Sequence, residues 1–403
     1  MRLKLNERQS LVRVNAARYQ GSSKRQKGRI LEEFVESTGY NRCYASFLLS
    51  RHGRRVRVDT KTTLVGDVSK RVRKKREPIY GPDVLAALRK IWANLDFLCG
   101  KRFKAVLSET LSKMERWDEI DVTAQTKEKL ERISSATIDR MLAPERKRLE
   151  LKSRSGTKPG TLLKNQIQIR TSADWDETKP GFTEVDLASH SGGDERGDFA
   201  QSLCLTDVAS TWSDAEAVRN KAQVNVFNGL KNIRKRLPFR LLGIDSDNGG
   251  EFINAHLVAY CKQEDITFTR SRPYRKNDNC FVEEKNYTLV RRAVGYLRYD
   301  SPEELEILNR LYHYWCLRSN YFLPTMKLVS KQRIGSKVVK KYDSPRTPYQ
   351  RLLGSPHVPP RVKQQLRQTY KELNPAQLTR EIARLQQRLL KTHQKKHRKK
   401  KVA

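Results

Sequence analysis

The chain has 403 residues, and its 82 Lys and Arg against 45 Asp and Glu give a formal net charge of +37 at pH 7. This length predicts two to four domains, and the cationic excess, which recurs along most of the chain, favours nucleic acid over a membrane as the partner. The longest apolar runs are only a few residues, and the segment after Met1 lacks the apolar stretch of a secretion signal. We therefore expect a cytosolic protein without a membrane partner.

The N-terminal region predicts a pair of short helices. Ser23-Lys24-Arg25-Gln26 fits a capping box and opens an amphipathic helix that ends at Thr38-Gly39, and a second helix is expected from Asn41 to about Ser50. Two such helices joined by a Gly-containing turn fit either a helix-turn-helix unit or an ordinary helical hairpin. Residues 51–76 carry eleven Lys or Arg against two Asp. This basic linker, which can follow a row of phosphates, favours the DNA-binding alternative.

A second helical region follows the basic linker. Amphipathic helices are expected from Pro82 to about Leu98 and from Arg102 to about Trp117. Residues Thr126–Arg132 and Ser135–Leu142, on either side of a break, form a second helix-turn-helix candidate. Two candidate units in tandem indicate DNA recognition more strongly than either one alone.

Beyond Lys179-Pro180-Gly181 the pattern changes from helical to alternating. The expected elements in chain order are strands Phe182–Ser189, Phe199–Val208 and Ala215–Val218, helix Ala222–Leu237, strand Arg240–Ser246, helix Phe252–Gln263, strand Ile266–Thr269 and a helix that starts near Phe281. Three antiparallel strands followed by alternating helices and strands is the order of a ribonuclease H-like core. We therefore predict a mixed five-stranded sheet with helices on both faces.

The C-terminal part of the chain is expected to be a basic, mainly helical extension. After an amphipathic helix over residues 302–318, the stretch from Lys327 to Lys341 has the composition of a basic irregular segment. A charged helix is expected from about Pro375 to Leu390. The last thirteen residues, Lys391–Ala403, carry seven Lys or Arg and are expected to stay disordered without nucleic acid.

Three carboxylates lie where they could share metal ions. Asp186 falls within the first expected strand, Asp247 follows the fourth strand, and Glu283 lies in the first turns of a helix. Between Asp247 and Glu283 there are 35 residues. Carboxylate oxygens are the ligands that Mg²⁺ prefers, and two ions held in this way support the cutting or joining of phosphodiesters.

Each of these acids also has a simpler interpretation. An Asp before Asn248-Gly249 is usual turn chemistry. Glu283 competes with Glu284 for the third position. Regular α-helical spacing favours Glu283, because it shares a face with Asn286 and Val290, whereas Glu284 projects about 100° away.

Three segments carry a family resemblance: Gly181-Phe-Thr-Glu-Val-Asp186, Asp245-Ser-Asp247-Asn-Gly-Gly-Glu-Phe252, and Arg272-Pro-Tyr-Arg-Lys-Asn-Asp-Asn-Cys-Phe-Val-Glu283-Glu-Lys-Asn286. They resemble the integrase catalytic core of bacterial insertion-sequence transposases and retroviral integrases. The resemblance covers about residues 180–320 and extends in organisation to the N-terminal helical region and to Thr347-Pro-Tyr-Gln-Arg-Leu-Leu353. One departure is Cys280, where most members have Gly.

The resemblance implies a prokaryotic, nucleoid-associated DDE transposase whose catalytic triad and metal ligands are Asp186, Asp247 and Glu283. Two Mg²⁺ ions, with Mn²⁺ as a substitute, would serve both nicking at the element ends and attack of the freed 3′-hydroxyl on target DNA. The implied partners are double-stranded DNA and further copies of the chain in a dimer or larger synaptic complex. Candidates to position the DNA backbone, each of which fits a solvated basic face about as well, are Asn286, Lys285, Arg291, Arg292, Arg270, Arg272, Arg275 and Lys276.

The predicted protein is multidomain. The expected parts are an N-terminal helix-turn-helix (1–55), a basic linker (56–80), a second helical DNA-binding domain (81–143), a linker (144–180), the ribonuclease H-like core (181–322) and the basic extension (323–403). Two other functions fit these modules. One is a catalytically silent DNA-binding regulator, and the other is a nuclease of the same fold without strand transfer.

Overall fold

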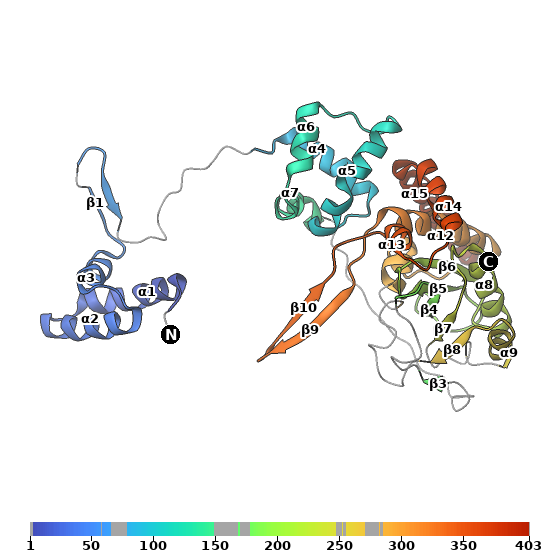
Figure 1. The fold of residues 1–403 in the computed structure, drawn as a ribbon, viewed down its shortest axis with the longest axis horizontal. Helices are drawn as coiled ribbons and strands as arrows, with labels where there is room; N and C mark the ends of the chain where they lie inside the picture. Colours follow the sequence, from blue (N-terminus) through green and yellow to red (C-terminus); the bar gives the residue numbers. More distant parts are fainter. Residues whose placement is uncertain are drawn as a thin grey trace. The chain divides into compact units, whose positions relative to one another are not determined.

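The computed structural model describes residues 3–57, 59–65, 79–148, 168–169, 178–246, 252, 255–270, 282 and 285–402. The chain divides into two compact units, Met1–Ile79 and Tyr80–Ala403 (Figure 1). Among the described residues, none of the helices has both the length and the apolar character that crossing a membrane requires.

The first unit is a small helical bundle followed by a hairpin. It contains α1 (Leu5–Gly21), α2 (Lys24–Thr38) and α3 (Arg42–Arg51), then the paired strands β1 (Arg55–Arg57) and β2 (Thr63–Val65). The predicted capping box at Ser23 is confirmed, and α2 ends at Gly39, whose φ of +66° is a left-handed conformation that glycine adopts readily. Helix α1 and the β1–β2 hairpin were not expected from the sequence. That α2 and α3 act as a helix-turn-helix remains a prediction.

The second unit begins with four helices. They are α4 (Pro82–Asn94), α5 (Gly100–Arg116), α6 (Ala124–Arg132) and α7 (Ser135–Arg148), which match the expected elements apart from their ends. Their apolar faces share one core cluster with side chains from later in the chain, including Trp212, Tyr321 and Leu366. The helical region and the C-terminal region are therefore parts of one packed body.

A mixed sheet forms the centre of the second unit. Its strands are β3 (Gln168–Ile169), β4 (Phe182–Ser189), β5 (Gln201–Asp207), β6 (Ser213–Val218), β7 (Gly243–Ser246) and β8 (Thr267–Arg270), in the spatial order β3-β8-β7-β4-β5-β6. The pairs β4–β5 and β5–β6 are antiparallel, whereas β7 and β8 run parallel to β4. The predicted five-stranded core is confirmed, and the two-residue β3 adds a sixth strand beside β8.

Helices cover both faces of this sheet, as predicted. On one face, Val185, Leu203 and Ile244 pack against side chains of α8 (Gln223–Arg236) and α9 (Ala255–Gln263). On the other face, Ala188 and Cys204 pack against the helical segment that contains Leu289, against α12 (Pro302–Phe322) and against the last helix of the chain. Asp186 lies in β4 at an alternate position to Val185, so it belongs to this second face.

The helical segment after residue 282 is not a regular α-helix. Residues Asn286–Arg291 form a π-helix, η2, and the short α11 (Arg292–Val294) continues it. Tyr287 is exposed, while Leu289 and Val290 are both buried. The α-helical spacing that favoured Glu283 over Glu284 therefore does not extend through η2. Both acids lie outside the described residues, and the choice of Glu283 stays a prediction.

The region from Lys327 to Lys341 was expected to be irregular, and this prediction is wrong. It forms an antiparallel hairpin of β9 (Leu328–Ile334) and β10 (Lys337–Tyr342). The chain turns at Gly335, whose φ is +59°. Pairing of the two strands then gives their backbone N–H and C=O groups hydrogen-bond partners, which the composition of the segment did not reveal.

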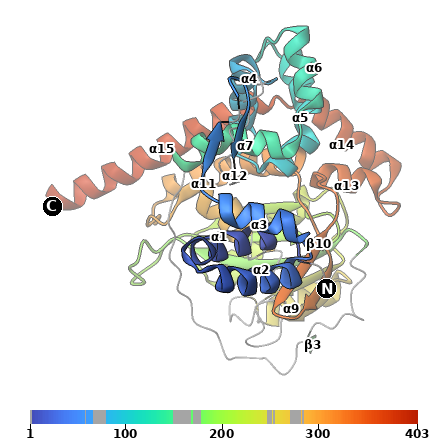
Figure 2. The same cartoon turned by 90° about the vertical axis from the view of Figure 1, so that its left-hand side faces the viewer.

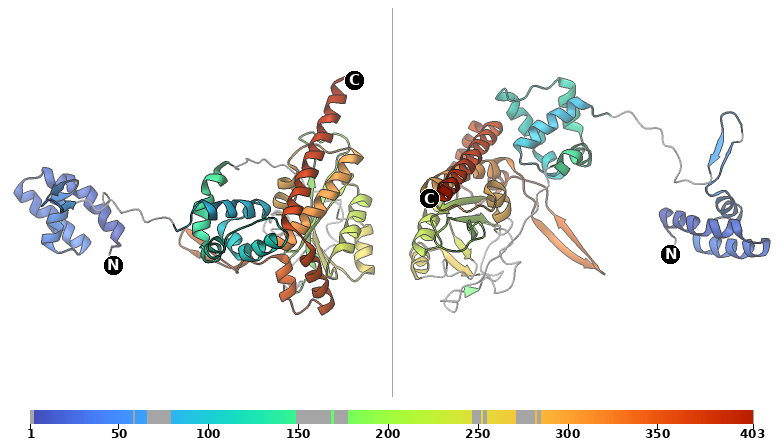
Figure 3. Two further views of the ribbon diagram at one scale, coloured as in Figure 1. Left: turned by 90° about the horizontal axis from the view of Figure 1, so that it is seen from above. Right: turned by 180° about the vertical axis from the view of Figure 1, so that it is seen from behind.

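The expectation of a disordered C-terminal tail is also wrong. After α13 (Pro348–Gly354) and α14 (Pro360–Glu372), α15 runs from Pro375 to Val402 and packs along α12 (Figures 2 and 3). Lys396, well inside the predicted tail, lies 2.6 Å from Asp300 and 2.9 Å from the buried Glu304. These carboxylates partly neutralise the basic sequence and hold the helix end in place.

The buried Asp207, at the end of β5, gives the fold a pH dependence. Burial raises its pKa to about 6, against the opposing effect of hydrogen bonds from Gly181 N–H and from the backbone and side chain of Ser210. The folded state therefore holds this proton more tightly than the unfolded chain, in which an Asp pKa is about 3.9. As pH rises through this window, the contribution of Asp207 to stability falls.

We predict that the free energy of unfolding of the wild type, relative to Asp207→Asn, falls by roughly 2 kcal/mol between pH 4 and 7, because each pKa unit corresponds to about 1.4 kcal/mol and the unfolded Asp is already half ionised at pH 4. Denaturant titrations of both proteins at several pH values measure this difference. A difference that does not change with pH would contradict the buried, proton-binding state of Asp207.

Candidate active site at strand β4

Asp186 is fixed in orientation by contacts on both of its carboxylate oxygens. Its Oδ1 accepts a hydrogen bond from Leu187 N–H at 2.8 Å, and its Oδ2 accepts one from the side-chain amide of Asn286 at 2.5 Å. The side chain is half-buried at the middle of β4. The central strand and the π-helix η2 thus meet at this carboxylate.

The pairing of β4 with β7 brings the residue directly before Asp247, the second predicted acid, next to the residue directly before Asp186. Val185, directly before Asp186, pairs with Ser246, directly before Asp247. Ser246 is completely buried at the end of β7. Asp247 itself lies outside the described residues.

A hydrogen bond to Glu184 brings to β4 the residue directly before Glu283, the third predicted acid. The backbone N–H of Val282 donates to Glu184 Oε2 at 3.1 Å, and both residues are fully buried. Glu283 follows Val282 in the sequence and lies outside the described residues.

Sequence reasoning missed two buried acids beside Asp186. Glu184 on β4 pairs with Asp245 on β7, and both are completely buried. Thr269 Oγ1 donates to Asp245 Oδ1 at 2.6 Å, which ties β7 to β8. Their signal in the sequence was an acid inside an otherwise apolar strand, which calls for a polar partner because an unpaired buried charge is costly.

Buried polar groups continue from Asp186 across β5. Cys204, its cross-strand partner, is completely buried, and burial raises the pKa of its thiol. The buried His190 contacts Ser202 Oγ at 2.7 Å, which in turn lies 2.6 Å from Tyr312 Oη. Burial lowers the pKa of His190 to about 3, so the imidazole is neutral at pH 7. Neither the protonated thiol nor the neutral imidazole is poised to act as a nucleophile or base.

The predicted DNA-contacting residues have different surroundings. Arg270 is buried at the end of β8, and Lys285 is half-buried beside Asn286. Arg291 lies over the ring of Tyr296, 4.8 Å from its centroid. The predicted contacts Arg272, Arg275 and Lys276 lie outside the described residues.

Arg292 pairs with the helical region instead of pointing freely to solvent. Its guanidinium lies 3.0 Å from Asp96, in the turn after α4, and Asp96 also lies 3.5 Å from Arg318. Arg318 is 3% exposed and its guanidinium lies over Trp315 at 4.2 Å. Asp96 therefore connects the helical region to both α11 and α12.

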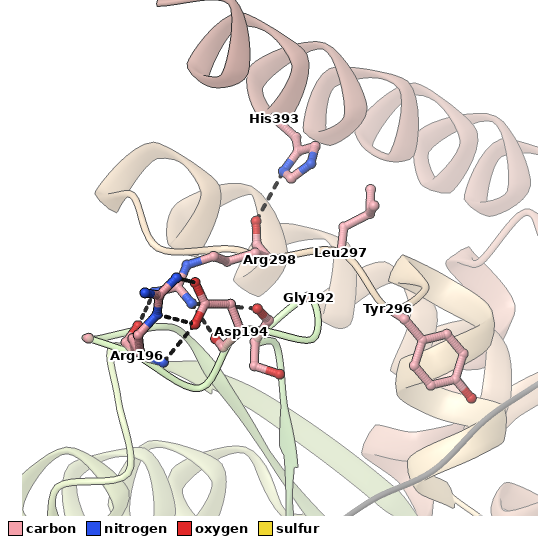
Figure 4. Close-up of a pocket in the computed structure, with 9 residues that line it drawn as sticks. Gly192, Asp194, Arg196, Tyr296, Leu297, Arg298 and His393 are labelled. Carbon is pink, nitrogen blue, oxygen red and sulfur yellow. Dashed lines mark hydrogen bonds and ion pairs between the residues drawn. The ribbon is translucent and has the colours of Figure 1, made fainter. Parts of the chain in front are cut away.

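A cavity of about 780 Å³ lies beyond the C-terminal end of β4 (Figure 4). Arg298 lines the cavity. The guanidinium of Arg298 donates to Asp300 and to the carbonyls of Asp194, Arg196 and Asp198 at 2.6 to 3.1 Å. These donors hold the loop after β4, so they are not directed at a ligand. The cavity is thus a less suitable reaction centre than the carboxylates around Asp186.

Carboxylate chemistry around β4 suits a divalent metal. Among the described residues no group of three metal-binding side chains comes together, and two of the three predicted ligands are outside that set. Asp186 supplies a hydrogen-bonded, oriented carboxylate of the kind that Mg²⁺ sites use. The donor type at the described position fits the predicted metal.

The Asp96 contact predicts unequal effects of two substitutions. Asp96→Ala should lower the free energy of unfolding by about 3 to 5 kcal/mol, because it leaves the buried Arg318 without its carboxylate. Arg292→Ala should cost about 1 kcal/mol, since the Arg292 side chain is 34% exposed and Asp96 keeps Arg318. Denaturant unfolding of the full chain measures both. Equal losses would show that Arg318 does not depend on Asp96.

Comparisons with known proteins give a relative that matches most of both chains and partial likenesses to solved structures. No protein-family model matches the chain. Among solved structures, the chain is similar to the HTLV-2 integrase catalytic core domain in complex with magnesium in its dimeric form, with a TM-score of 0.29, 12% identity, and coverage of 37% of this chain and 93% of that one. It is also similar to the catalytic core domain of BIV integrase, with a TM-score of 0.25, 16% identity, and coverage of 42% and 91%.

In sequence, the chain matches the uncharacterized protein y4rM of Sinorhizobium fredii (strain NBRC 101917 / NGR234). The two sequences are 37% identical over 350 residues, which span 87% of this chain and 96% of the relative. At this identity and coverage, the chain belongs to the same protein family as y4rM.

Proposed function

We propose that the chain is a DNA transposase that cuts DNA at element ends and joins the freed 3′-hydroxyl to a target. The observation that carries this proposal is the set of contacts on β4: the pairing of Val185 with Ser246, the hydrogen bond from Val282 to Glu184, and the hydrogen bond from Asn286 to Asp186. Each contact brings to the Glu184–Asp186 part of β4 a residue that lies one or three positions from one of the other two predicted acids.

Chain connectivity supports the convergence of the three acids. Consecutive Cα atoms lie about 3.8 Å apart across a trans peptide. Asp247 directly follows Ser246 in the sequence, and Glu283 directly follows Val282, so the proposal takes both acids to lie beside Asp186. In this proposal Asp186, Asp247 and Glu283 hold two Mg²⁺ ions, for which Mn²⁺ can substitute.

The bound ions would supply activation of the attacking oxygen and stabilisation of the leaving oxygen in phosphodiester displacement. The chain's own residues would orient the ligands: Asn286 and Leu187 N–H hold the Asp186 carboxylate from two sides. The π-helix supports this role, because such local insertions often occur at functional sites. Water would serve as the nucleophile for nicking, and the 3′-hydroxyl for joining.

The substrate in this proposal is double-stranded DNA. The formal charge of +37 favours a polyanion, and basic residues extend over both units. Because two element ends must be joined to one target, the active form would be a dimer or a larger assembly with DNA. The first unit and the α6–α7 pair are the proposed recognition elements.

The test uses the full chain with a labelled duplex from the inverted repeat that flanks the gene, a target plasmid and Mg²⁺. Asp186→Asn, Asp247→Asn and Glu283→Gln should each reduce joined products by at least about a thousandfold, because each removes a ligand whose charge holds the ions. Glu284→Gln is the matched control and should retain joining. Chelation of the metal should abolish joining by the wild type.

The outcomes separate the rival functions. Joining that survives Asp247→Asn would sink the two-metal proposal and leave a role in DNA binding. Strand cutting without joined products would indicate a nuclease of the same fold. If Glu284→Gln abolishes joining and Glu283→Gln does not, the third ligand is Glu284.

A further inference from the structure

We infer that the β9–β10 ribbon, Leu328–Tyr342, is an arm that binds the backbone of duplex DNA along one basic face. All seven residues of β9 are exposed, and so are Val338, Val339, Lys340, Lys341 and Tyr342 of β10. Among the residues that the structure describes, the ribbon therefore buries neither face. An uncovered two-stranded ribbon is only marginally stable, so its persistence calls for a partner or a firm root.

The root of the ribbon is firmly held. Lys327 and Asp343 exchange hydrogen bonds at 2.7 and 3.0 Å, and Arg351 donates to Asp343 Oδ2 at 2.7 Å and to Thr325 O at 3.0 Å. Thr325 also contacts Thr211, in the turn between β5 and β6, at 2.7 Å. Burial raises the pKa of Asp343, but hydrogen bonds from Arg351 and from Lys327 N–H lower it further, so the ionised carboxylate of Asp343 is favoured. The arm is thus fixed to the proposed catalytic sheet.

One face of the ribbon concentrates positive charge. Residues directly opposite in an antiparallel pair project to the same side. Lys331 pairs with Lys340, and Arg333 pairs with Val338, so three of these four neighbouring side chains are cationic. No acidic residue occurs between Lys327 and Tyr342.

This arrangement is unfavourable without an anionic partner. Like charges directly opposite each other destabilise a strand pair. Within the described part of the chain, no ion pair or side-chain hydrogen bond is found for Lys331, Arg333 or Lys340. A row of phosphates would relieve this repulsion, whereas a second copy of the same ribbon would add to it. Duplex DNA is therefore the partner that the charges favour.

The dimensions also fit DNA. The major groove admits a two-stranded β-ribbon, and a strand of seven residues is about 23 Å long at about 3.3 Å per residue. That length covers about two-thirds of one helical turn of B-DNA, which rises about 34 Å. The ribbon can therefore follow several consecutive phosphates.

The inference rests on the proposed DNA substrate, but its test is independent of catalysis. DNA binding by the full chain is measured by fluorescence anisotropy with a labelled random-sequence duplex, in EDTA, over a series of salt concentrations. The ribbon variant is Lys331→Gln/Arg333→Gln/Lys340→Gln. The matched control, Arg361→Gln/Arg367→Gln/Lys371→Gln, removes the same charge from exposed positions of α14. Thermal melting checks that both variants fold.

The ribbon variant should bind more weakly, and its slope of log K against log salt should be less steep by about 3, because each lost phosphate contact removes about 0.9. The α14 control should keep the wild-type slope. An equal loss in both variants would indicate a nonspecific effect of net charge and overturn the inference. An unchanged slope for the ribbon variant would overturn the inference as well. So would a ribbon variant that binds DNA as the wild type does but sediments differently without DNA, because the ribbon would then contact another copy of the chain.

The same measurements distinguish this inference from the proposed function. Asp186→Asn should keep the wild-type salt slope while losing strand joining. If the ribbon variant alone changes the slope and no protein joins DNA, the ribbon binds DNA and the transposase proposal fails. If joining is intact and the ribbon variant binds as the wild type does, the ribbon inference fails and the transposase proposal stands.

Discussion

The second unit depends on the position of β4 between an antiparallel partner, β5, and a parallel partner, β7. This arrangement pairs Glu184 with Asp245 in the interior, where both side chains are completely buried. Burial of two carboxylates is costly unless hydrogen-bond donors meet them. Val282 N–H meets Glu184, and Thr269 meets Asp245. The need to satisfy these acids therefore ties β4 to the segment before η2 and ties β7 to β8.

A second group of buried charges joins the C-terminal helix to this sheet. Glu304 on α12 is completely buried and accepts hydrogen bonds from Lys396 on α15. Arg298, whose carbonyl accepts from Lys396 at 3.2 Å, holds the loop after β4 through its guanidinium. Part of the basic C-terminal sequence is thus structural. Cations for which the described residues supply no carboxylate partner, such as Lys331 and Lys340, are better placed to meet DNA.

The elements that the sequence predicted well are those whose signals are local. Strand Phe182–Ser189 has the predicted bounds because its side chains alternate in character, and α2 begins directly after the predicted capping-box residue Ser23. The five-stranded order followed from the succession of strands and helices. The β9–β10 hairpin was missed because its apolar residues, such as Val329, Val338 and Val339, do not alternate regularly with polar ones, so the sequence carries little periodicity. The π-helix was missed because α-helical spacing was assumed for a segment held by Asp186.

The sequence by itself determined the three candidate carboxylates, their order and spacing, the strand that carries Asp186 and the strong positive charge. Residue type and local periodicity are enough for these properties. Only the tertiary structure decided that Val185 pairs with Ser246, that Val282 contacts Glu184, and that Asn286 holds Asp186. It also decided which basic residues are paired with acids and which are exposed. These facts depend on contacts between residues far apart in the chain, and the free energy of such contacts comes from burial and hydrogen bonding that no local pattern encodes.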